Sequence, residues 1–160
     1  MTLSIPIKTS AAPVAPGSTA PIRNDGWLPD IEPDALRAGY RIREVVTPER
    51  LRTAVIGAIM AARADLRSWC AARLAAGYAS LADVPADKVD GESVLVLSYR
   101  RAIGAYVRAE LIEGYRDTDL TGRGDRKVDD LEPSVDELRR DAIHAIRDML
   151  EVGRTTVELI

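Results

Sequence analysis

Residues 47–77 have an uninterrupted helical periodicity of apolar residues, and this stretch limits the possible folds more than any other part of the chain. Thr47 is a good N-cap, Pro48 suits the first helical position, and Gly77 is a natural C-terminal stop. At 1.5 Å per residue, a helix of roughly 29 residues is about 43 Å long. That is long for a chain of 160 residues, which suits one domain. Its apolar stripe is predicted to comprise Leu51, Val55, Ala58, Ala62, Leu66 and Trp69, widened by Ile59, Cys70 and Leu74.

A second long helix is predicted over residues 92–116. The segment 94–97 alone reads equally well as a strand, but the apolar residues that follow it are spaced by threes and fours. These residues occupy more than one face, so we expect this helix to be the central one. Before it, Pro85 and the Asp90-Gly91 turn pair make residues 78–91 a connecting loop.

Two more helices complete the predicted fold. A short one is expected near 33–39, between a proline at its first position and a glycine at its end. The other is expected over 134–152, because Ser134 and Glu137 have the spacing of a capping box and Gly153 suits its end. The predicted fold is therefore all-α, a small helical bundle.

Composition and charge agree with packed helices. Apolar residues make up 46% of the chain, mostly Ala, Leu, Val and Ile, and there is no Phe. The net charge of −3 argues against a dedicated duplex-DNA binder, which usually has a strongly basic face. Residues 37–76 carry eight Arg and three acids, whereas residues 81–160 carry 18 acids and 12 bases. This asymmetry either draws one end of a copy to the other end of its neighbour, or merely reflects solvated helix faces.

The two ends of the chain differ from the bundle. Residues 1–26 are predicted to form an extended Pro/Ala-rich arm, since six of the nine prolines lie between Pro6 and Pro33. The helical bundle is expected to span 27–153, with Trp27, Leu28 and Ile31 anchoring the arm. Residues 154–160 are predicted to form a strand-like tail for which the sequence offers no partner strand, which favours pairing with another molecule. The predicted docking residues are Thr155, Thr156, Val157, Glu158, Leu159 and Ile160.

No residue set supports catalysis, a metal or a cofactor. Cys70 is the only cysteine and His144 the only histidine, so metal or catalytic sites built from several cysteines or several histidines are excluded. No Cys–His catalytic pair has support in the sequence. The glycine-containing loop at 122–127 lacks the Walker pattern. We interpret it as a flexible charged loop; a second interpretation is that Arg123, Arg126 and Lys127 contact DNA or an acidic neighbour. No apolar run reaches membrane-spanning length, and the N-terminus lacks the pattern of a secretory signal.

Several segments, in order and spacing, resemble the head-completion proteins of temperate contractile-tailed phages, the gene L type. The resemblance covers most of residues 27–160, and residues 81–93 are its most specific part. The segments that carry it are Leu28–Ile31 with Pro33, Val46–Arg52, Ala75–Tyr78, Leu81–Asp87, Asp90–Ser93, Gly124–Lys127 and Asp136–Asp141.

The resemblance implies a structural protein without enzymatic activity, located in the virion at the head–tail junction and in the host cytoplasm during assembly. Such proteins bind the portal vertex after DNA packaging, stabilise the filled head and provide a platform for the tail or a tail-side connector or terminator protein. Related adaptors form rings, commonly dodecamers, around packaged DNA. The sequence leaves two alternatives: a small helical DNA-binding protein and a generic helical enzyme subunit.

Overall fold

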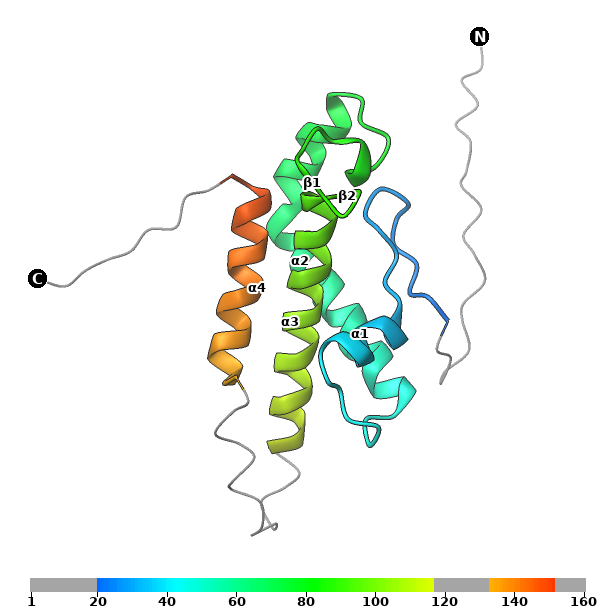
Figure 1. Ribbon diagram of the computed structural model, residues 1–160, viewed down its shortest axis with the longest axis vertical. Coiled ribbons are helices and arrows are strands. Elements are labelled where there is room, and N and C mark those ends of the chain that lie inside the picture. The colour runs from blue at the N-terminus through cyan, green and yellow to red at the C-terminus, as the bar shows by residue number, and fades with distance from the viewer. Residues whose placement is uncertain (1–19, 117–132, 152–160) are drawn as a thin grey trace, which may run out of the picture.

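The computed structural model describes residues 20–116 and 133–151 (Figure 1). This part is mostly helical, with a short 3₁₀ turn, η1 (Leu81–Asp83), and one small hairpin. The helices are α1 (Pro33–Gly39), α2 (Pro48–Ala75), α3 (Val94–Arg116) and α4 (Val135–Met149), and the hairpin strands are β1 (Lys88–Val89) and β2 (Glu92–Ser93). No helix in the described ranges is both long and apolar enough to cross a membrane.

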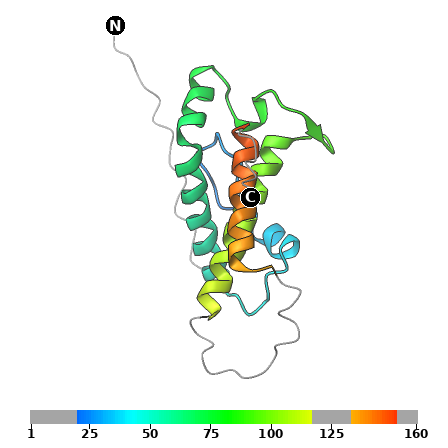
Figure 2. The same cartoon turned by 90° about the vertical axis from the view of Figure 1, so that its left-hand side faces the viewer.

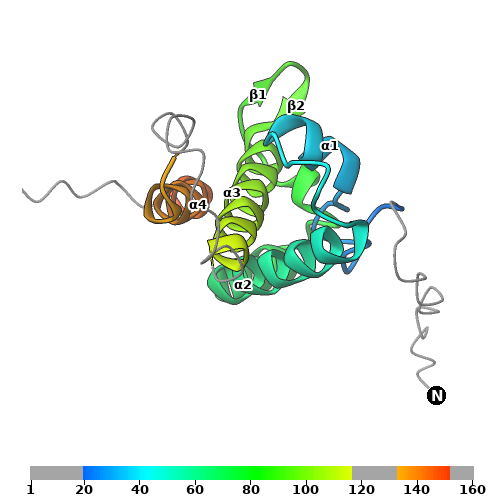
Figure 3. The same ribbon diagram turned by 90° about the horizontal axis from the view of Figure 1, so that it is seen from below.

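Helix α3 is the central element of the bundle. It packs against α4 along one side and against α2 along another, while α2 and α4 hardly touch each other (Figures 1 and 3). Tyr99, Ile103 and Val107 on α3 have no exposed surface. Burial on several faces confirms the central position predicted from the sequence.

Helix α2 has the boundaries that its terminal residues predict. The Thr47 hydroxyl accepts a hydrogen bond from the N–H of Arg50 at its start. At its end, Gly77 adopts a left-handed φ of 93°, and the N–H of Tyr78 reaches back to the carbonyl of Arg73. The predicted stripe is buried from Leu51 to Leu66.

One part of the predicted α2 core is wrong. Leu74 is 52% exposed, although its spacing placed it beside the buried stripe. Trp69 and Cys70 pack against the core but are only partly buried. Leu74 lines an open groove on α2, and no local pattern in the helix records which of its sides another element covers.

Helix α4 begins as predicted and ends earlier. Ser134 and Glu137 form the reciprocal capping box, with the Ser134 N–H donating to the Glu137 carboxylate at 2.7 Å. The helix stops at Met149 rather than near 152, because Glu151 takes a left-handed φ of 57°. Met149 is 1% exposed. The stop thus follows the last buried turn, and Gly153 does not set it.

The hairpin corrects both the all-α prediction and the start of the second long helix. Asp90 and Gly91 have φ values of 52° and 77°, the two positive angles of a type I′ turn that matches strand twist. Lys88 pairs with Ser93 in the antiparallel ladder. The buried Ser93 hydroxyl then accepts a hydrogen bond from the N–H of Leu95, so α3 begins at Val94 and not at residue 92.

The expected arm also needs a correction at its inner end. Ile22 is 4% exposed and exchanges two backbone hydrogen bonds with Ile31, at 2.8 and 3.0 Å. The packed domain therefore begins before residue 27. The predicted anchor is confirmed: Trp27 is buried, its indole N–H donates to the carbonyl of Tyr78, and its ring meets Trp69 edge-on at 6.1 Å.

Candidate docking surface

The docking and channel residues predicted from the sequence lie outside the described residues. This holds for Thr155–Ile160, for the arm up to residue 19, and for Arg123, Arg126 and Lys127. They stay predictions. Among the described residues, no group of three or more His, Cys, Asp or Glu is placed to hold a metal ion.

The single cysteine and the single histidine lie on different helices. His144 lies half-buried on α4, and Cys70 lies half-buried on α2. Burial raises the pKa of the Cys70 thiol, which disfavours the nucleophilic thiolate.

The feature that does point to function is a second apolar face on α2. We call it the α2 outer stripe, and it runs opposite the buried stripe of the same helix. Three of its side chains are large and exposed: Ile56 (43%), Met60 (67%) and Leu74 (52%). Its members recur every three or four residues, as one helix face requires. They are Ile56, Met60, Ala64, Arg67, Ala71 and Leu74.

An open groove of about 440 Å³ borders the outer stripe. The stripe forms one wall from Met60 to Leu74, and the loop around Asp25 and Leu28 forms the other. Arg63 crosses between them, with a salt bridge of 2.9 Å to the Asp25 carboxylate. The groove is thus an apolar channel with arginines at its edge.

The loop wall of this groove is held in place by Asp25. Its carboxylate accepts hydrogen bonds from the N–H groups of Trp27 and Leu28, each at 3.0 Å. Burial raises the pKa of Asp25, but the bonds from Leu28 and Trp27 and the charge of Arg63 outweigh it and lower the pKa below its usual value. Asp25 therefore stays ionised and keeps the loop closed onto α2.

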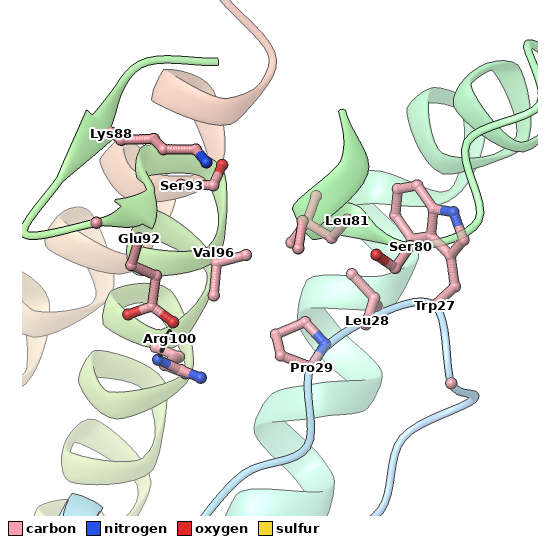
Figure 4. Close-up of a pocket in the computed structure, with 13 residues that line it drawn as sticks. Trp27, Leu28, Pro29, Ser80, Leu81, Lys88, Glu92, Ser93, Val96 and Arg100 are labelled. Atoms are coloured by element: carbon pink, nitrogen blue, oxygen red, sulfur yellow. Dashed lines mark hydrogen bonds and ion pairs between the residues drawn. The ribbon is translucent and has the colours of Figure 1, made fainter. Parts of the chain in front are cut away.

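A second recess, of about 320 Å³, lies between the hairpin and the same loop (Figure 4). Leu28 and Leu81 line one side, and Arg100 pairs with Glu92 at 2.6 Å on the other. Its hydroxyls are engaged: Ser80 donates to Asp83 at 2.7 Å, and Ser93 accepts from the backbone. The recess is therefore a surface depression, and neither of these serine hydroxyls is an activated nucleophile.

Sequence reasoning missed the outer stripe, although the signal was present. Ile56 and Met60 continue to Leu74 at the helical period, but Leu74 was assigned to the core. A helix with apolar residues on two faces indicates two contact surfaces. The stripe has one charged member, Arg67, and so lacks the strongly basic face expected of a small helical DNA-binding protein.

Comparison with known proteins gives the family. Residues 22–160 match the family model described as phage head completion protein (GPL). The chain is also 39% identical over 154 residues to the head completion/stabilization protein of Escherichia phage P2, with 91% of each chain covered. No protein of solved structure matches. The chain therefore belongs to the phage head completion protein family.

Proposed function

We propose that this protein assembles as a ring on the portal vertex of the filled head. There it stabilises the packaged DNA and presents the surface to which the tail, or a tail-side connector or terminator protein, attaches. Family membership over residues 22–160 carries the proposal, together with the name of the phage P2 relative. A protein of this family is virion-associated, which agrees with the proposed location.

The α2 outer stripe supports assembly. A monomer gains nothing from exposing Ile56, Met60 and Leu74 on one helix face, whereas an interface buries them. The charges of residues 37–76 and 81–160, +5 and −6, favour contacts between unlike ends of neighbouring copies. Repeated contacts of this heterologous kind close into rings when the rotation permits. A dodecamer is the expected size.

The segments outside the described ranges supply the other proposed contacts. Thr155–Ile160 would add a strand to the portal protein or to an adjacent copy, since the alternating, β-branched sequence suits edge pairing. Arg123, Arg126 and Lys127 would face the DNA in the channel without reading its sequence.

Particles made without the protein test the function directly. We expect heads that package DNA, lose it on storage and fail to join tails, and complementation with the wild-type chain should restore all three. Imaging of complete particles should place the chain at the portal vertex. Density for the chain elsewhere in the particle would refute the location.

Deletion of residues 154–160 tests the tail. Attachment to the portal should weaken, while the helical circular dichroism stays nearly unchanged. Val157→Pro should reproduce the loss, because proline cannot donate to a ladder, and Glu158→Gln serves as the matched control. Unchanged attachment in the deletion variant, or loss of its fold, would refute the docking role.

A further inference from the structure

We propose that the hairpin of one copy docks into the groove along the α2 outer stripe of the next copy. This inference rests on the proposed ring and names its lateral contact.

The groove has an apolar floor and a positive rim. Met60 and Leu74 expose 67% and 52% of their surface along it, with alanines between them. Within the described ranges, Arg67 has neither a hydrogen bond nor an ion pair, whereas Arg63 is shared between Asp25 and Asn24. A partner with an exposed apolar side chain and acidic residues beside it would satisfy both features.

The hairpin and the turn before it have that chemistry. Residues 83–92 contain four acids and one lysine, a formal charge of −3. Val89 lies on the first strand, 57% exposed, and the side chains of Asp87 and Asp90 have no partner in the described part of the chain. The type I′ turn fixes the backbone, so docking orders little additional chain.

The two surfaces lie where a head-to-tail contact needs them. Figure 3 places the hairpin and α2 on opposite sides of the bundle. Figure 2 shows the hairpin at the same end of the bundle as the C-terminal half of α2, which carries the groove residues from Arg63 to Leu74. The loop at residues 25–29 separates the hairpin from the groove of its own copy, since Leu28 lines both the recess beside the hairpin and the groove. The groove is therefore left open to the hairpin of a neighbouring copy. Repetition of this contact uses both surfaces on every copy.

Charge complementarity favours a second copy over other occupants. The groove rim is basic, and the hairpin is an acidic protrusion with an exposed apolar side chain. The remaining candidates, the C-terminal tail and the portal protein, become outcomes of the test.

Cysteine cross-linking in assembled particles tests the contact. In a Cys70→Ser background, Val89→Cys is combined with either Met60→Cys or Leu74→Cys. Mild oxidation should give a ladder of covalent multimers, because each copy carries both halves of the contact. Each single-cysteine variant should stop at dimers or fewer. Particles that contain the protein but give no ladder with either pair would overturn the inference.

Charge exchange provides a second test. Arg67→Asp and Asp87→Arg should each reduce ring assembly by about tenfold, and the double variant should recover most of the loss. Ile143→Glu, on the exposed face of α4, is the control expected to leave assembly unchanged. Singles without effect, or a double variant that stays defective while folded, would overturn the contact. A ring joined through other surfaces contradicts only this inference, whereas particles without any ring contradict the proposed function.

Discussion

The ring of Tyr40 lies directly on Gly104, so close that a β-carbon at Gly104 would overlap its atoms. Tyr40 is the C-cap of α1, and Gly104 lies near the middle of α3, where it is buried. The Tyr40 hydroxyl also donates to the carbonyl of Arg101 at 3.3 Å. This contact fixes the segment that joins α1 to α2 against the central helix.

Gly104→Ala should therefore destabilise the fold, although alanine is the better helix former. Displacing Tyr40 should lower the free energy of unfolding by roughly 1–3 kcal/mol, the usual range for overpacking. Urea unfolding measures it. Gly39→Ala is the control, because nothing lies within 4 Å of its added β-carbon. If Tyr40→Ala fails to relieve the Gly104→Ala defect, the contact with Tyr40 is not its cause.

Truncation should lower the stability much more at Leu66 than at Leu74, although both are leucines on α2. Leu66 has no exposed surface, so Leu66→Ala should cost about 2–5 kcal/mol of stability. Leu74 is half exposed, so Leu74→Ala should change stability by about 0.5 kcal/mol or less. The Leu74→Ala substitution should nevertheless impair head completion in particles. Equal stability losses would place the outer stripe in the core after all.

Tyr99 should make stability fall at high pH. Burial raises its pKa from 10.0 to about 12, while its hydroxyl accepts a hydrogen bond from Asn24 at 2.8 Å. Below pH 10 both states are protonated and the stability is complete. Between about pH 10 and 12 the unfolded chain ionises first, so the free energy of unfolding should fall by about 2–3 kcal/mol.

Urea titrations across that pH range measure the fall. Tyr99→Phe is the comparison, and its curve should be flatter because the phenol that ionises is gone. Tyr40 and Tyr106, whose pKa values burial also raises, should leave a residual slope. Parallel curves for the two proteins would mean that Tyr99 is not the main titrating group.

Ser134→Ala should remove the capping box of α4. The loss of the Ser134 hydroxyl leaves the Glu137 N–H without its acceptor and should cost about 1 kcal/mol. Thermal or urea unfolding measures it. Thr53→Ala on α2 is the control, since its hydroxyl only donates to a carbonyl within the helix. A Ser134→Ala variant as stable as wild type would show that the cap contributes nothing measurable.

The sequence by itself determined the features that neighbouring residues decide. Thr47 and Ser134 cap helices through hydrogen bonds three residues away, Gly77 ends α2, and Asp90-Gly91 forms its turn. These signals are readable because the atoms involved lie within one turn of chain. The resemblance to head-completion proteins was readable for a similar reason, since it rests on ordered local motifs.

Only the tertiary structure decided which surfaces are buried. Leu74 has the spacing of a core residue but faces solvent, and Ile22 lies in an apparent arm but is buried against Ile31. Helix α4 ends at Met149, just before the left-handed φ of Glu151, and so earlier than the sequence predicted. In each case the burial of the side chain or the end of the helix depends on which distant segment packs alongside. Helical periodicity predicts which residues share a face, but it does not predict which segment covers that face. The sequence therefore shows the helical spacing of the outer stripe, but the positions of α3 and of the loop at residues 22–31 determine that the stripe is exposed.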